Sequence, residues 1–421
     1  MINLPEKGVI RVFIPDSEKE MMHLHTIYAD NAATTKMSKT ALDAMLPFFT
    51  ENYGNPSSLH TVGQKAAEAL WQAREDVAAC IGAAAREIIF TSGGSEADNQ
   101  AIISAARQGE RKNKKHIVST AFEHHAVLHT LKKLEKEGFE VTLLDVHENG
   151  LVSPEQVADA IRPDTCLVSV MFANNEIGTV QPIKEIGAVC RERKVPFHCD
   201  AVQAVGHLPV DVNALNVDFL CASAHKFHGP KGVGFLYARK GTILTNLIEG
   251  GAQERGKRAG TENIPAIVGM AAALKEATAG LAENAAKISA VRDALIEGLS
   301  DIPHSILNGD REKRLPGNVN FCFEGIEGES ILLLLDDKGV CASSGSACTS
   351  GSLDPSHVLL AIGRPHEIAH GSLRLSLSEE NTLEDAAYIV DAVRETVTLL
   401  RGMSPVWRDL VEGKKPFVIK E

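Results

Sequence analysis

The sequence predicts an α/β protein with a large domain around a mainly parallel sheet, followed by a smaller α/β domain. Seven short apolar runs, many of them β-branched, recur between residues 87 and 238, and helical periodicity fills most of the gaps, as in βαβ crossovers. Most runs are apolar throughout, which is typical of parallel strands buried on both faces. The expected strands are 87–92, 116–120, 140–146, 165–173, 196–202, 219–225 and 232–238.

Helical periodicity marks the segments between these strands. Gly82 closes the first expected helix, because glycine readily ends a helix. The expected helices are 63–81, 95–107, 124–137 and 183–194.

A long helical stretch, 264–300, breaks the alternation and is expected to link the large domain to the second region. The second region again mixes strands and helices, which predicts a smaller α/β domain. Its expected parts are a strand at 318–323, a helix at 328–337, a Ser/Gly-rich loop at 343–353, a strand at 372–377 and a helix at 383–401.

The composition is that of a globular protein. The 421 residues are 44% hydrophobic and 23% charged, with a formal net charge of −12, which excludes disordered, collagen-like and coiled-coil classes. The longest basic cluster, 111–115, is expected to be a solvated loop, so no nucleic-acid partner is expected.

The N-terminal sequence has neither an apolar signal core nor the pattern of a strong structural element. Acidic residues and prolines interrupt it, and no apolar run in the chain approaches about 18 residues. We therefore expect a cytoplasmic protein without a membrane span. Met21 or Met22 is a candidate for the true start, a hypothesis that N-terminal sequencing of the native protein would test.

The eight cysteines contain no CxxC pair, so neither a zinc ribbon nor a disulfide framework is expected. Cys348 differs from the other seven because it lies in a Ser/Gly/Thr-rich stretch, which suits an exposed, reactive thiol. The other seven are expected to be small packing residues; they are Cys80, Cys166, Cys190, Cys199, Cys221, Cys322 and Cys341.

Lys226, in SAHKFHGPKGVG, follows a β-rich run and precedes a Gly-Pro turn, which places its amine where it could face a cleft. A single lysine is usually a surface charge, but a buried amine can form a Schiff base, and pyridoxal 5′-phosphate (PLP) is the usual aldehyde partner. PLP would need a carboxylate for its pyridinium nitrogen, and Asp200 ends an apolar strand.

Two further requirements of PLP also have candidates. Its phosphate would need small residues at a helix N-terminus, which Gly93, Gly94 and Ser95 supply. His124, after a strand, could stack on the ring and assist proton transfer. Arg374 lies within an apolar strand, so it must face either a structural counter-charge or a substrate carboxylate, and the residues alone leave both open.

Taken together, these motifs resemble the cysteine desulfurases of the NifS/IscS type. These belong to the class V aminotransferase family, the PLP-dependent transferases of fold type I (aspartate-aminotransferase-like). The resemblance covers nearly the whole chain apart from about 25 residues at its start. The matching motifs include YADNAATT (28–35), SGGSEADN (92–99), EHHAVL (123–128), HCDAVQAVG (198–206), SAHKFHGPKGVG (223–234), RAGTEN (258–263) and ASSGSACTS (342–350).

The resemblance implies a role for each matching residue. The catalytic residues would be Lys226, which forms the Schiff base with PLP, His124, and Cys348, the nucleophile. Arg374 and Asn175 would bind the substrate, and Thr261 would come from the neighbouring subunit of a homodimer. The implied PLP-binding residues are Gly94, Ser95, His124, Asn175, Asp200, Gln203, Ser223, His225, Lys226 and Thr261.

The resemblance also implies a domain division: residues 38–265 would form the large PLP domain with its seven-stranded sheet. Residues 1–37 and 266–421 would form the small domain that carries the Cys348 loop. Two departures from the family pattern are Ala32, where an Asn is common, and Ser95, where Thr is commoner; the hydroxyl at Ser95 preserves phosphate binding, whereas Ala32 removes a side-chain contact near the substrate.

The implied activity converts L-cysteine to L-alanine and leaves a persulfide on Cys348. The sulfur would pass to a NifU- or IscU-like scaffold protein for iron–sulfur cluster assembly, with a transient metal contact of Cys348 through the persulfide in that complex. The closing LRGMSPVW (400–407) looks most like the nitrogen-fixation branch. The alternatives are a selenocysteine lyase or another PLP-dependent aminotransferase-like enzyme; a transaminase would need no loop thiol.

Overall fold

The computed structural model describes residues 26–344 and 355–420. Within these residues seven strands form the largest sheet, in the order β2-β8-β7-β6-β5-β3-β4. The pairs from β7 to β4 are parallel, whereas β8 runs antiparallel to both β2 and β7. The strands are β2 (Ile88–Thr91), β3 (His116–Thr120), β4 (Glu140–Leu144), β5 (Thr165–Ser169), β6 (Phe197–Asp200), β7 (Phe219–Ser223) and β8 (Gly234–Ala238).

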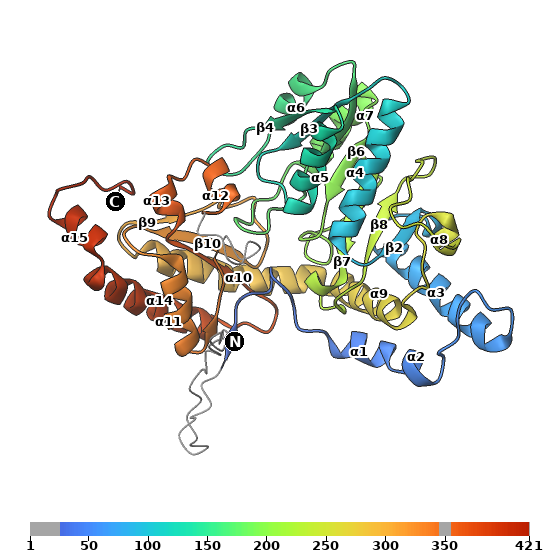
Figure 1. Ribbon diagram of the computed structural model, residues 1–421. Coiled ribbons are helices and arrows are strands. Elements are labelled where there is room, and N and C mark those ends of the chain that lie inside the picture. Colours follow the sequence, from blue (N-terminus) through green and yellow to red (C-terminus); the bar gives the residue numbers. More distant parts are fainter. Residues whose placement is uncertain (1–25, 345–354, 421) are drawn as a thin grey trace, which may run out of the picture.

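Helices pack around this sheet, as Figure 1 shows for α4 and α5, which lie side by side over it. All but one of the strands are buried along their whole length, as the apolar runs predict; β4, at the sheet edge, is only partly buried. The helices are α1 (Lys39–Met45), α2 (Pro47–Thr50), α3 (Thr61–Cys80), α4 (Gly94–Glu110), α5 (His125–Lys136), α6 (Pro154–Ala160), α7 (Ile183–Arg193), α8 (Gln253–Gly256) and α9 (Ile264–Ala279), with 3-10 turns at Ala85–Glu87 and Ala224–Lys226.

A second, smaller assembly follows α10 (Leu281–Ser300). An antiparallel sheet has the order β12-β10-β9, and β1 pairs in parallel with β11. The elements are β1 (Ile27–Tyr28), β9 (Ser305–Leu307), β10 (Asn318–Phe323), β11 (Val340–Cys341), β12 (Ser372–Ser376), α11 (Gly328–Asp337), α12 (His357–Ala361), α13 (His366–Ala369), α14 (Leu383–Met403) and α15 (Pro405–Val411).

The periodicity predicts one long helical stretch at 264–300, but the structure has two helices there. α9 and α10 meet at Gly280 with a bend of 73°. α9 packs on α1 and α3, whereas α10 packs on α14, so the two helices serve different cores. Among the described residues no single helix is long and apolar enough to cross a membrane; the bent pair α9–α10 reaches the required length and composition only when taken together.

The cysteines are less uniformly buried than expected. Cys166, Cys190, Cys199, Cys221 and Cys322 are buried free thiols, but Cys80 and Cys341 are only partly buried, at the end of α3 and in the short strand β11. Cys348 lies outside the described residues.

Candidate active site

A pocket of about 400 Å³ opens where β2 and β7 end and α4 begins. Residues from three separate segments line it, since the carboxyl ends of parallel strands converge at one edge of a sheet. The lining residues include Gly94, Ser95, Ser223 and His225, all expected from the sequence, together with Thr34 and Lys231, which were not.

The start of α4 is shaped for an anion. The amides of the first helical turn have no intrahelical acceptor, and the helix dipole places positive charge there. Gly93 has a φ of 153°, a conformation that residues with side chains rarely adopt, and a Cβ on Gly94 would lie 2.5 Å from Val202 Cγ2, so both positions require glycine.

Lys226 lies in the 3-10 turn that follows β7. Its Nζ donates hydrogen bonds to the carbonyl oxygens of Ala32 at 2.6 Å and Ala33 at 2.8 Å. Gln203 Nε2 donates to the same Ala32 carbonyl at 3.0 Å. The backbone at Ala32, where the side chain departs from the family pattern, therefore holds two expected site residues.

Asp200 is buried at the end of β6, and its Oδ1 accepts a hydrogen bond from the Val202 amide at 2.9 Å. Burial raises the pKa of Asp200 to about 6, with a further upward contribution from Asp98. His124 caps α5, and its Nδ1 accepts from the Ala126 amide at 3.1 Å. Burial lowers the pKa of His124, so the imidazole is neutral at pH 7 even though Asp200 opposes the shift.

Arg374 is almost fully buried on β12 and meets a structural counter-charge. Its Nη2 lies 2.9 Å from Asp30 Oδ1, and its Nη1 donates to the Asn175 carbonyl at 3.2 Å. Arg374 Nε has no hydrogen-bond partner among the described residues, which leaves a donor for another acceptor. Of the two alternatives open from the sequence, the ion pair is therefore present.

Neither Asn175 nor Thr261, two further expected site residues, is among those that line the pocket. Asn175 is half-buried beside Arg374, and Thr261 is exposed. Cys348 lies outside the described residues.

The chain is similar to known proteins in both sequence and fold. The class-V aminotransferase family model matches residues 27–389. The cysteine desulfurase IscS of Clostridium botulinum (strain Hall) is 54% identical over 392 residues, covering 92% of this chain and 98% of that protein. The chain belongs to the cysteine desulfurase family. The IscS of Methanosarcina thermophila is 55% identical over 380 residues, covering 90% of this chain and 94% of that protein.

Solved structures agree with this assignment. A NifS-like protein, 38% identical, covers 89% of this chain and 100% of its own, with a TM-score of 0.84. A structure described as SspA in complex with cysteine is 38% identical and covers 84% of this chain and 99% of its own, with a TM-score of 0.75. These matches confirm the predicted fold type and the resemblance, and the enzymes of this family depend on PLP.

The residues of this cysteine desulfurase fit the cofactor. The glycine-lined start of α4 suits its phosphate, and the buried carboxylate of Asp200 suits its ring nitrogen. Lys226 lies on the next strand end, so one edge of the sheet supplies all three groups.

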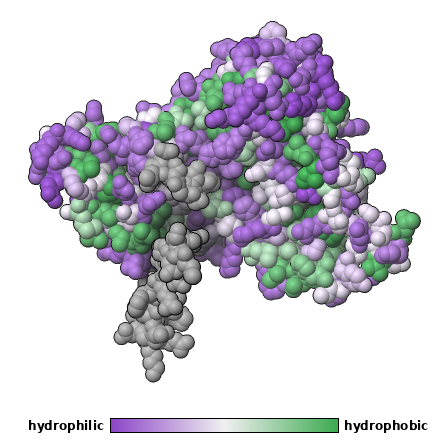
Figure 2. Space-filling model, viewed as in Figure 1, coloured by the Kyte–Doolittle hydropathy of each residue, from purple (hydrophilic) through white to green (hydrophobic). Residues whose placement is uncertain are grey.

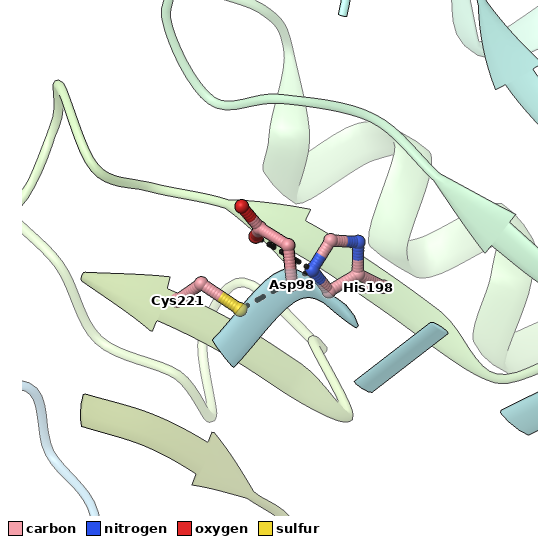
Figure 3. Close-up of side chains that lie close together, drawn as sticks. All are labelled: Asp98, His198 and Cys221. Carbon is pink, nitrogen blue, oxygen red and sulfur yellow. Dashed lines mark hydrogen bonds and ion pairs between the residues drawn. The ribbon is translucent and has the colours of Figure 1, made fainter. Parts of the chain in front are cut away.

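Sequence reasoning missed a buried group behind the pocket (Figure 3). His198 Nε2 lies 3.3 Å from Asp98 Oδ1 and 3.3 Å from Cys221 Sγ, and His198 Nδ1 is hydrogen-bonded to Ser169 Oγ at 2.8 Å. Asp98 lies one helical turn after Gly94, within the motif SGGSEADN that the sequence analysis identified. The sequence could not show that its side chain is buried in the core.

The donor atoms of Asp98, His198 and Cys221 lie within 4.8 Å of one another, a spacing that suits a metal ion. Burial, however, raises the pKa of Asp98 to about 7 and that of the Cys221 thiol well above its ordinary value, and lowers the pKa of His198 to about 4. These groups carry protons and lie away from solvent, so we interpret them as a hydrogen-bonded group that links α4, β6 and β7, and not as a metal site.

Gly94→Ala tests the glycine cradle, the proposed phosphate site formed by Gly93, Gly94 and Ser95 at the start of α4. The added methyl group meets Val202, and overpacking of this kind costs about 1–3 kcal/mol. Strain of that size at the start of α4 should weaken PLP binding by roughly fivefold to a hundredfold. Visible absorption of bound PLP after dialysis measures the loss. Gly402→Ala is the control, since nothing lies within 4 Å of that Cβ. Undiminished PLP retention in Gly94→Ala would contradict the assignment.

Asp98→Asn tests the buried carboxyl through pH. The pKa of Asp98 is raised from 3.8 to about 7, so below pH 4 both folded and unfolded chains hold the proton, whereas above pH 4 burial increasingly destabilises the folded chain. The stability gained by Asp98→Asn relative to the native chain should therefore grow between pH 5 and pH 8 by at least about 1 kcal/mol.

Urea denaturation at pH 5 and pH 8 measures this difference. The control is Asp391→Asn, because the Asp391 side chain is 72% exposed and should give the same small effect at both pH values. An equal effect of Asp98→Asn at both pH values would rule out a buried, proton-bearing Asp98.

Proposed function

We propose that the chain removes sulfur from L-cysteine, releases L-alanine and holds the sulfur as a persulfide on Cys348. The observation that carries the proposal is the convergence of Lys226, Asp200 and the glycine cradle at one sheet edge, in a chain 54% identical to a cysteine desulfurase IscS. A structural relative described as a complex with cysteine supports the choice of substrate.

Each side chain then has a defined task. PLP, when bound, supplies an electron sink for negative charge at the substrate Cα. The Lys226 amine would move the Cα proton. Arg374, held in place by its ion pair with Asp30, would bind the substrate carboxylate together with Asn175. His124 is neutral at pH 7, and its Nδ1 lone pair accepts the Ala126 amide, so Nε2 carries the ring proton. The ring can take the thiol proton of Cys348 at Nδ1 once that hydrogen bond is broken.

Sulfur transfer needs no added oxidant. The Cys348 thiolate attacks the substrate sulfur, so an S–S bond forms as the substrate Cβ–S bond breaks. The electron pair goes to carbon, which takes up a proton to become the methyl group of alanine. Cysteine and one thiol thus yield alanine and one persulfide.

Cys348→Ala tests the proposal. The variant should lose sulfide release from cysteine in the presence of a reducing thiol by at least about a hundredfold, because no nucleophile remains, while its PLP absorption stays unchanged. Cys341→Ala, at the other cysteine near this segment, is the control and should retain activity. Sulfide release at the native rate by Cys348→Ala would overturn the role of Cys348.

We propose that the persulfide sulfur goes to a NifU- or IscU-like scaffold protein for iron–sulfur cluster assembly, with a transient metal contact at Cys348. The LRGMSPVW segment supports an acceptor in nitrogenase maturation. We place the protein in the cytoplasm, because the described cysteines are free thiols and the chemistry requires a reduced one.

We also propose a large domain of residues 38–265 and a small domain of residues 1–37 and 266–421. Three clusters of buried apolar residues bear on this division. Two pack against the large sheet, and the third joins Ile27 and Ala29 to residues between Ile288 and Val397. Val358, Leu359 and Ile368 of the small domain also pack in one of the large-sheet clusters, which ties the two domains together. α9 packs on the large domain as its link to α10.

A homodimer is the assembly we propose, with Thr261 contributed to the partner's site. Apolar side chains are exposed along α1, α2 and the start of α3, and Figure 2 shows hydrophobic surface at the lower right, over α1 and α2. Leu46, Phe49 and Tyr53 are each more than half exposed there. Contiguous exposed apolar surface of this kind is typical of a protein interface.

Phe49→Asp should convert the dimer to a monomer, because a charge would be buried in the apolar contact. Sedimentation velocity measures the change, and PLP retention should fall with it if Thr261 of one subunit serves the other. Leu333→Asp is the control, since Leu333 is also exposed, at 74% against 57% for Phe49, but lies on α11. A Phe49→Asp variant that sediments as a dimer would contradict this interface.

A further inference from the structure

Three imidazoles gather beside the active site without a role in the proposed reaction. His125 and His129 lie four residues apart on α5, so they share one face of the helix. His357, the first residue of α12, approaches them from a segment more than 200 residues away in sequence. The ring centroids are 4.6 Å apart for His125 and His357, and 5.0 Å apart for His125 and His129.

Hydrogen bonding prepares His357 as a ligand. Its Nε2 lies 3.0 Å from the Glu123 carbonyl oxygen, so Nε2 carries the proton and Nδ1 keeps its lone pair. A backbone carbonyl that orients an imidazole in this way is the usual outer partner of a metal-binding histidine. His357 is therefore held in one tautomer with one nitrogen available.

The other two imidazoles are accessible. His125 is half-buried and His129 is exposed, so solvent and ions reach them. The charges that act on His125 are those of His357 and His129. Burial lowers the pKa of His125 and of His357, so their rings are neutral at pH 7 and offer lone pairs.

We propose that His125, His129 and His357 bind a divalent transition-metal ion. Imidazole nitrogen suits Zn²⁺, Cu²⁺, Ni²⁺ and Fe²⁺, whereas Mg²⁺ and Ca²⁺ need oxygen ligands. Three protein ligands leave a coordination position for water, as in open zinc sites. The ion would tie α12 to α5, whose N-cap is His124.

The site differs from the two other groups that the structure offers. Asp98, His198 and Cys221 are fully buried, and the raised pKa values of Asp98 and Cys221 favour their proton-bearing forms over metal ligation. His366 and His370 also lie four residues apart, with ring centroids 4.7 Å apart, but His370 caps the end of a four-residue helix. That pair provides a control of similar spacing.

The experiment measures Ni²⁺ binding to the PLP-loaded chain by competition with a chromophoric chelator. The native chain should show one tight site, and His129→Gln should weaken it at least about tenfold, the scale on which even outer partners of metal ligands act. His129 is exposed, so this variant should fold normally. His370→Gln should leave the tight site unchanged.

X-ray absorption of the Ni²⁺ complex provides a second measurement, and it should show imidazole nitrogen in the first shell. Absence of a tight site in the native chain would overturn the proposal. So would equal affinity in His129→Gln, or a site lost in Cys348→Ala or Asp98→Asn but kept in His129→Gln, because the ion would then be bound by thiols or by the buried group.

Discussion

The segment from Ala29 to Thr35 is the constraint on which the site depends, because it is hydrogen-bonded to both cores. On one side, the Ser376 carbonyl oxygen of β12 accepts a hydrogen bond from the Asn31 amide at 3.1 Å, and the Ser376 amide donates to the Ala29 carbonyl oxygen at 2.7 Å. On the other side Lys226 donates to the Ala32 and Ala33 carbonyls. A shift of this segment would therefore move the reactive amine and the strand that carries Arg374 together.

The ion pair between Asp30 and Arg374 belongs to the same segment, and it joins residues 344 positions apart. A buried guanidinium is costly unless it is paired, so Asp30 both keeps Arg374 charged in the core and fixes its orientation. The Arg374 Nε, which has no hydrogen-bond partner among the described residues, is itself buried, so this geometry supports the structural role. The substrate-binding role stays a prediction.

Sequence patterns predicted the strands of the large sheet and the residues at their carboxyl ends, because apolar runs and strand-end motifs are local. They could not predict the reversal of β8 or the break at Gly280, since the direction of β8 and the packing of α9 and α10 are set by distant partners. Nor could they locate Asp98: a carboxylate on a helix normally faces water, and only the packed fold buries it. The roles of all the site residues, Thr261 and Cys348 included, remain predictions.

The formal charge of −12 treats every carboxyl group as ionised, but the interior does not. Burial raises the pKa of Glu123 to about 8 and that of Asp98 and Glu176 to about 7, so each holds a proton for much of the time at pH 7. Asp200, at about 6, is mostly ionised. Asp98 raises the Asp200 pKa only while it is ionised, and Asp200, whose pKa is the lowest of these four, is left as the carboxylate able to pair with a positive ring nitrogen.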